Sequence, residues 1–372
     1  MNNKSSATPY RYSVEHSVKG RLMSLDILRG ITVAGMILVN NGYGESFNAL
    51  THSKWNGMTP CDLVFPFFLF IMGVSMCLSF SKHEYKLTRP LAVKIVRRFL
   101  VLFLIGLFIN WFELAINGHF FDFENLRIWG VMQRIAICYL IVSLLVLTLH
   151  HKWLIPTVLT LLITYGLILW LGNGYVQDAS NVIAKVDNSI FSSSHLYHKS
   201  PVDPEGLLST ISSVAHVLIG FCVGWQIKRI AFSNDKTRWL LILGIAMLIA
   251  GLLLSFLLPL NKRVWSPSYV LATCGLASLL WGILIWLIDS KGYTASIPFF
   301  LAFGVNPLAI YVLSELLAIV LGHIGVSQAV YDAIHSCVAH LQTASLLYAL
   351  YFVLLNYLCA FLFYKKRMFI KL

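Results

Sequence analysis

Ten long apolar runs constrain this chain more than any other feature of its sequence. A helix needs about 20 mostly apolar residues to cross the hydrocarbon core of a bilayer. Only 12% of the residues are charged, about half the share of a soluble domain. The sequence therefore predicts an all-α polytopic membrane protein of about ten transmembrane helices. The runs lie near residues 24–42, 61–81, 91–111, 129–149, 153–172, 207–227, 239–259, 267–288, 298–321 and 344–364.

The polar segments between these runs are short. The longest is 173–206, and none could form a soluble domain of its own. We therefore predict an N-terminal tail over residues 1–22 and a single transmembrane domain over 23–372. A cleavable signal peptide is not expected, because the first twenty residues are polar.

Basic residues are distributed unevenly between the two sides of the predicted bundle. If the amino terminus is inside, about three quarters of the 28 Lys and Arg residues lie on the inner side, which predicts that both termini are cytoplasmic. The net charge of +12 flanks the apolar runs, so it predicts contact with anionic lipid headgroups and not with nucleic acid. The seven cysteines form no CxxC pair, and we predict no metal site.

A polar cluster at the predicted outer face is the strongest candidate site. The stretch "THSKWNGMTPCDLVFPFF", residues 51–68, places His52 ten residues before Asp62, at the start of the second run. A carboxylate beside a histidine fixes its tautomer and supports acid–base chemistry, although Asp62 could equally cap a helix. Asn40 and Asn41 end the first run, where an amide is either a helix cap or a donor to an oxyanion.

Charged and amide side chains also lie inside the apolar runs. Asp26 and Arg29 stand three residues apart on one helical face, so they either pair with each other or leave Arg29 facing an anionic ligand. Gln133 and Arg134 lie one helical turn inside the fourth run. A buried arginine needs a carboxylate, a carbonyl or a phosphate as its partner.

Two further segments contain polar residues for which the sequence allows two alternative roles. Asp203 and Glu205, in "VDPEGLLST", either cap a helix or bind the ammonium of an amino sugar. Asn306, in the helix-breaking "GVNP", either lines a cavity or sits in a packed kink.

Several stretches resemble the heparan-alpha-glucosaminide N-acetyltransferase family of polytopic membrane enzymes. The specific ones are "RLMSLDILRGITVAGMILVNNGYG" and "HSKWNGMTPCDLVFPFFLFIMGVS", and the likeness extends through "LRIWGVMQRIAICYL", "DPEGLLSTISS", "KRVWSPSYV" and "PFFLAFGVNPLAIYV". The resemblance implies transfer of an acetyl group from cytosolic acetyl-CoA to a glucosamine amine across the membrane. It also implies that His52 is the catalytic histidine and Asn40 the motif asparagine.

The resemblance is to short, bacterial-type members, because the chain lacks the long amino-terminal extension of lysosomal ones. It implies an inner (plasma) membrane location, while the identity of the glycan or amino-sugar acceptor stays open. We expect His52 to be a general base or an acetyl carrier, held by Asp62 and assisted by Asn40. Arg29, Arg97, Arg98, Gln133, Arg134 and Asn306 are the residues predicted to bind acetyl-CoA. Asn41, Trp55, Asn56, Asp203 and Glu205 are those predicted to bind the acceptor.

One geometric difficulty accompanies this mechanism. Pantetheine extends roughly 15–20 Å, whereas the membrane core is about 30 Å thick, so the donor site must be a deep funnel or the acetyl group must be relayed. Two other functions stay open: a membrane O-acyltransferase that acts on polysaccharide hydroxyls, and a secondary transporter of an anionic solute. Membrane lipids are expected partners, and the chain could form a homodimer.

Overall fold

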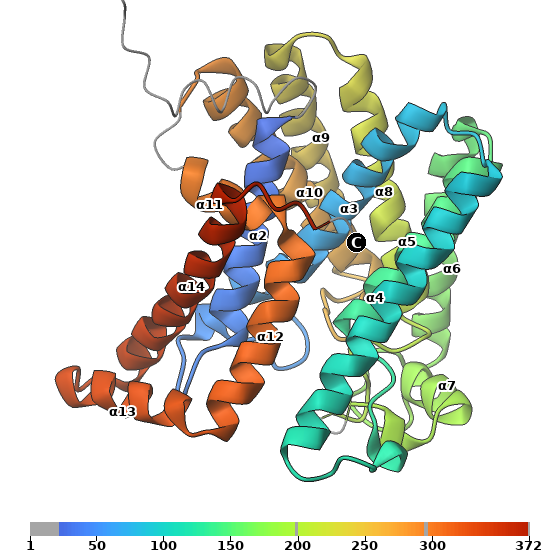
Figure 1. Ribbon diagram of the computed structural model, residues 1–372. Helices are drawn as coiled ribbons and strands as arrows, with labels where there is room; N and C mark the ends of the chain where they lie inside the picture. The colour runs from blue at the N-terminus through green and yellow to red at the C-terminus, as the bar shows by residue number, and fades with distance from the viewer. Residues whose placement is uncertain (1–21, 198–199, 294–296, 371–372) are drawn as a thin grey trace, which may run out of the picture.

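A computed structural model describes residues 22–197, 200–293 and 297–370, and these form an all-helical bundle with no strand (Figure 1). The predicted tail lies outside the described residues except for Leu22. The helices are α2 (Met23–Asn40), α3 (Val64–Phe80), α4 (Arg89–Ile116), α5 (Val131–Thr148), α6 (Leu154–Leu171), α7 (Val182–Ile190), α8 (Thr210–Arg229), α9 (Ser233–Leu254), α10 (Pro267–Leu284), α11 (Ile297–Val305), α12 (Pro307–His323), α13 (Val326–Cys337) and α14 (Leu341–Lys365).

The prediction of an all-α membrane protein is confirmed. In the part of the chain that the structure describes, nine helical stretches are long and apolar enough to cross a membrane. The predicted ninth run, 298–321, is not one straight helix: α11 and α12 meet at an angle of 85°. The break falls at Asn306–Pro307, because proline disfavours helical geometry in the residue before it and has no N–H for the preceding turn.

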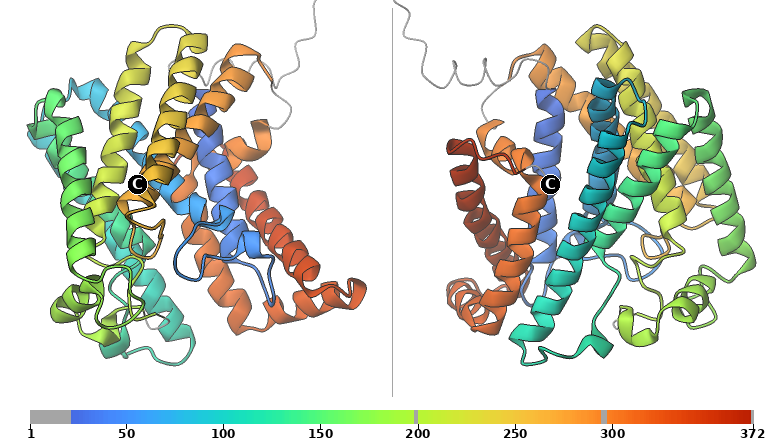
Figure 2. Two further views of the ribbon diagram at one scale, coloured as in Figure 1. Left: turned by 180° about the vertical axis from the view of Figure 1, so that it is seen from behind. Right: turned by 45° about the vertical axis from the view of Figure 1, so that its right-hand side comes forward.

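The two ends of the bundle differ in the connecting segments and short helices that lie there. The segment 41–59, α7 and α13 lie at one end, at the bottom of Figure 1, and the views of Figure 2 place them together as well. The α3–α4 and α8–α9 connections lie at the opposite end. We call these the His52 end and the Arg97 end. The helices α7 and α13 are short and amphipathic, and their few apolar residues explain why no span was predicted for them.

Glycines allow α2 and α11 to touch backbone to backbone. A Cβ on Gly30 would lie 1.8 Å from the Phe300 carbonyl oxygen, and one on Gly304 would lie 2.0 Å from the Asp26 carbonyl oxygen. Small residues are the usual means of such close packing in membranes. As a result, the broken segment after Gly304 lies against Arg29, whose Nη1 donates to the Gly304 carbonyl at 3.3 Å.

Candidate functional site

His52 and Asp62 form a hydrogen-bonded pair at the start of α3. The His52 Nδ1 lies 2.8 Å from Asp62 Oδ1, and the Asp62 side chain is fully buried. The second oxygen, Oδ2, accepts from the backbone N–H groups of Ser53 (3.1 Å) and Thr59 (3.0 Å). Asp62 therefore both orients the imidazole and caps the short 3-10 helix Pro60–Leu63 that leads into α3. Since a carboxylate only accepts, Nδ1 carries the proton and Nε2 is left as the acceptor.

Lys262, for which we predicted no role, completes this cluster from the α9–α10 connection. Its Nζ lies 3.1 Å from His52 Nδ1, 3.2 Å from His52 Nε2 and 3.7 Å from Asp62 Oδ1. Burial lowers the pKa of the Lys262 ammonium below its usual range, although the charges of Asp62 and Glu205 oppose that change. The cluster thus consists of one acid, one imidazole and one amine. In the sequence, Lys262 stands in the "KRVWSPSYV" block, on the predicted outer side.

Trp55 and Asn56, predicted to bind the acceptor, hold the His52 segment against its neighbours. The Trp55 indole N–H donates to the Tyr175 carbonyl at 2.7 Å. The Asn56 side-chain oxygen accepts from Asn261 at 3.0 Å, next to a backbone bond from the Gly57 N–H to the 260 carbonyl at 2.7 Å. The Trp55 N–H and the Asn56 side-chain oxygen are therefore engaged within the fold.

The two asparagines that end α2 have different surroundings. Asn41 donates to the Ile37 carbonyl at 2.8 Å and acts as a helix cap. Asn40 is exposed at the last position of α2, and its amide lies near the Glu315 side chain of α12. Asn40 is thus the amide of the two that faces the space between α2 and α12.

Asp203 and Glu205 share one guanidinium. Arg127 Nη2 lies 2.9 Å from a carboxylate oxygen of each. Burial raises the pKa of Glu205, but the positive charges of Arg127 and Arg134 outweigh it and hold that pKa below its usual value. Arg134 is fully buried and donates to the Gly206 carbonyl (3.0 Å) and the Ser209 hydroxyl. The predicted arginine partner is therefore a carbonyl.

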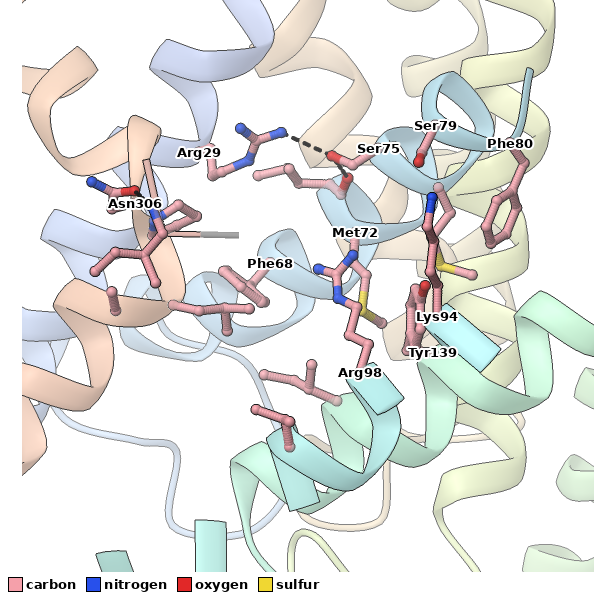
Figure 3. A pocket seen from close by; sticks show the side chains of 18 of the residues that line it. Arg29, Phe68, Met72, Ser75, Ser79, Phe80, Lys94, Arg98, Tyr139 and Asn306 are labelled. Atoms are coloured by element: carbon pink, nitrogen blue, oxygen red, sulfur yellow. Dashed lines mark hydrogen bonds between the residues drawn. The ribbon is translucent and has the colours of Figure 1, made fainter. Parts of the chain in front are cut away.

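A cavity of about 690 Å³ opens among α2, α3, α4, α5 and α12, toward the Arg97 end (Figure 3). Four of the residues predicted to bind acetyl-CoA line it: Arg29, Arg97, Arg98 and Asn306. Lys94 and Tyr139 join them. Gln133 and Arg134 are buried and do not belong to this lining.

The polar groups of this cavity are held in different ways. Arg29 pairs with Asp26 (Nη1 to Oδ1, 2.8 Å) and donates to the Ser75 hydroxyl (2.9 Å), so it forms the predicted pair and also faces the cavity. The Arg98 guanidinium lies over the Tyr139 ring, 4.6 Å from its centroid. Both ends of the Asn306 amide bond the backbone of residues 368 and 370, at 2.7 and 2.9 Å. Among the described residues, no group of His, Cys, Asp and Glu could hold a metal ion.

Residues 21–180 match the family model described as "Heparan-alpha-glucosaminide N-acetyltransferase, catalytic". The resemblance predicted from the sequence to this family is confirmed. A Mus musculus protein named Heparan-alpha-glucosaminide N-acetyltransferase is 30% identical over 375 residues, which cover 83% of this chain and 55% of the mouse protein. A Homo sapiens protein of the same name is 29% identical over 359 residues, 78% of this chain and 52% of the human protein.

The chain spans about half the length of the curated relatives that it matches. The family model covers α2 to α6 and includes His52, Asp62 and the basic residues of the cavity. Two residues of these sites lie beyond the matched segment. Lys262 lies beside His52, and Asn306 lines the cavity, because the tertiary fold brings them there.

Proposed function

We propose that this protein is a membrane acetyltransferase that receives acetyl-CoA at the Arg97 end and delivers the acetyl group to an amino sugar of the glucosamine type at the His52 end. The printed names of the relatives support an N-acetyltransferase with a glucosaminide acceptor. The observation that carries the proposal is the His52–Asp62 pair just before α3, together with a basic cavity that the same helix lines.

The cavity has the chemistry expected of a donor site. Phosphate groups bind arginine and lysine through charge-assisted hydrogen bonds. In the described part of the chain, Lys94, Arg97 and Arg98 form no ion pair, so their charge can serve a polyanion. A volume of about 690 Å³ lies in the usual range for sites of small molecules and cofactors.

The length of α2 supports a direct reach from the cavity to Asn40. Arg29 lines the cavity, and Asn40 ends the same helix eleven residues later, roughly 16 Å away along the axis. An extended pantetheine arm covers roughly that length. A donor with its phosphates at the basic side chains would therefore place its thioester beside Asn40, and a relay across the whole membrane is not needed.

The His52 cluster supplies the proton transfers. His52 Nε2 accepts the proton that the amine loses as the new C–N bond forms, and the same proton then goes to the thiolate that leaves when the C–S bond breaks. Asp62 holds the imidazole in the required tautomer. Asn40 donates to the acetyl oxygen as negative charge develops on it, a contribution of about 3–4 kcal/mol in enzymes where such a donor has been removed. The apolar bundle limits loss of the acetyl group to water.

The sidedness follows from the distribution of charge. We place both termini and the Arg97 end in the cytoplasm, where acetyl-CoA is available, and the His52 end outside a bacterial plasma membrane. Residues 23–372 then form one domain that carries both sites.

The test is transfer of labelled acetyl from acetyl-CoA by the full chain purified in detergent. We expect a labelled product with glucosamine and none with methyl glucoside, which offers hydroxyls but no amine. Labelled methyl glucoside would instead favour the O-acyltransferase. If neither acceptor is labelled, and acetyl-CoA does not raise the melting temperature, the proposal is wrong.

A further inference from the structure

Lys262 is a nearly buried amine at the His52 end whose hydrogen-bond donors are not used up within the fold. Its side chain is 11% exposed, and its Nζ lies 3.1 Å from His52 Nδ1 and 3.2 Å from His52 Nε2. The Asp62 carboxylate, at 3.7 Å, is close enough for an ion pair but too far for a hydrogen bond. Among the described residues, no oxygen accepts a hydrogen bond from this ammonium, which carries three N–H groups.

The position of the amine beside the imidazole leaves His52 free to act as a base. The Nε2 lone pair points away from Nδ1, so a partner in line with it would be much farther from Nδ1 than from Nε2. The Lys262 Nζ is instead almost equidistant from the two ring nitrogens. Lys262 therefore lies beside the ring and does not occupy the lone pair. The His52 side chain is also 45% exposed, so a substrate can reach Nε2.

A substrate at Nε2 would bring the reacting oxygen close to Lys262 as well. The acceptor nitrogen must lie within hydrogen-bonding distance of Nε2 to lose its proton. In the tetrahedral intermediate, the acetyl oxygen is two bonds from that nitrogen. An amine 3.2 Å from Nε2 is therefore within reach of the oxygen on which negative charge develops. A charged donor forms a stronger hydrogen bond to such an oxygen than a neutral amide does.

We propose that Lys262 is a second catalytic donor, whose ammonium donates a hydrogen bond to the acetyl oxygen of the tetrahedral intermediate in addition to Asn40. The inference rests on the proposed function and adds a residue to its chemical step. As the C–N bond forms, one electron pair of the carbonyl moves onto the oxygen beside the ammonium. When the C–S bond breaks, that pair returns to the carbonyl and the thiolate leaves. Lys262 keeps its proton throughout, while His52 carries the proton from nitrogen to sulfur.

The first test compares Lys262→Met with Lys54→Met in the transfer of labelled acetyl to glucosamine. Lys262→Met should lower kcat about a hundredfold, the usual effect of removing one oxyanion donor, and should leave the KM for acetyl-CoA near that of the wild type. Lys54→Met is the matched control, because Lys54 is an exposed lysine two residues after His52, and it should keep the wild-type kcat.

Each outcome of this comparison decides for or against the inference. A wild-type kcat in folded Lys262→Met overturns it. If Lys262→Met does not fold, Lys262→Gln replaces it, with a loss of kcat as support and an unchanged kcat as contradiction. If the wild type itself transfers no acetyl group, the proposed function fails, and the inference falls with it.

The pH dependence of kcat separates a donor to the oxyanion from a merely structural ion pair. Burial lowers the pKa of the Lys262 ammonium, so its charge is lost at a lower pH than that of an exposed lysine. The titratable groups that face it are His52, Cys61 and Asp62 from the segment before α3, Glu205 from the segment before α8, and Arg263 from its own turn. In Lys262→Arg the charge persists, because guanidinium stays protonated. The ratio of the wild-type kcat to that of Lys262→Arg should therefore fall from about pH 7 to about pH 10, and a constant ratio overturns the inference.

Discussion

The two ends of the bundle use charge in opposite ways. At the His52 end, ionisable side chains are paired and held in place: Asp62 bonds His52 and two backbone N–H groups, and Arg127 joins two carboxylates. At the Arg97 end, Lys94, Arg97 and Arg98 line an open cavity, and none forms an ion pair with the described residues.

This difference suggests that the His52 end positions groups for chemistry, whereas the Arg97 end attracts a charged ligand. Groups that are fixed before the reaction need no reorganisation when charge develops, which favours the chemical step. Basic side chains without internal partners instead suit the binding of a polyanion, whose charge replaces the missing partner. Substitutions at the His52 end should therefore lower kcat, and substitutions at the Arg97 end should raise the KM for the donor.

The largest effect is expected from His52→Ala. Removal of His52 should lower kcat at least about a thousandfold, because the amine loses its proton acceptor and the leaving thiolate loses its proton donor. Labelled transfer to glucosamine measures kcat, and the melting temperature with and without acetyl-CoA measures donor binding, which should not change. Cys61→Ser is a matched control, since the Cys61 sulfur lies 3.1 Å from His52 Nδ1 and should be dispensable. If His52→Ala keeps the wild-type kcat, His52 is not the catalytic base, and the proposed contrast between the two ends is wrong.

The sequence predicted those features that depend on neighbours along the chain. Apolar length is a local property, so most spans were found within about four residues of their bounds, whereas the bounds of α4 and α9 differ by up to six residues. The pairing of Asp26 with Arg29 follows from helical spacing, and it is present. Asp62 was predicted in two alternative roles, and it has both, because one oxygen serves the imidazole and the other serves the backbone.

Features that depend on distant segments were not predictable in the same way. Lys262 reaches His52 across 210 positions of sequence, and Arg127 meets Asp203 across 76. No periodicity encodes such contacts, since they arise from how α9, α10 and the polar connections close over the His52 segment. The break at Asn306 was visible in "GVNP", but its angle and its contact with residues 368 and 370 depend on tertiary packing.

An intermediate effect is expected at the Arg97 end. Arg98→Gln removes one cationic side chain from the cavity, so the KM for acetyl-CoA should rise about tenfold while kcat changes less than threefold. Arg89→Gln, at the exposed start of the same helix and outside the cavity lining, should leave both constants near wild type. The comparison becomes sharper if added salt reduces the difference between wild type and Arg98→Gln, because salt screens charge. A fall in kcat at constant KM would instead assign Arg98 to the chemical step.

The smallest effect concerns Asp187 on α7, where the pairing at the His52 end is incomplete. Its Oδ1 accepts from the Leu208 N–H at 3.2 Å, whereas Oδ2 has no partner within the described residues. Burial raises the pKa of this carboxyl from 3.8 to about 6.

Because the pKa of Asp187 is higher in the folded chain than in the unfolded chain, this carboxyl makes the protein less stable as the pH rises. Below about pH 3 the carboxyl is protonated in both the folded and the unfolded chain, and its contribution to stability is fully present. As the pH rises from about 4 to 6, the unfolded chain ionises this carboxyl while the buried group stays protonated, so at most about 3 kcal/mol of stability is lost. Asp187→Asn lacks this loss, so its melting temperature should exceed that of the wild type by a few degrees at pH 7.5, and the difference should shrink as the pH falls to about 4. Asp178→Asn, an exposed change in the same connection, should alter neither value. Equal melting temperatures of Asp187→Asn and wild type at pH 7.5 would show that the ionised Asp187 side chain does not destabilise the fold.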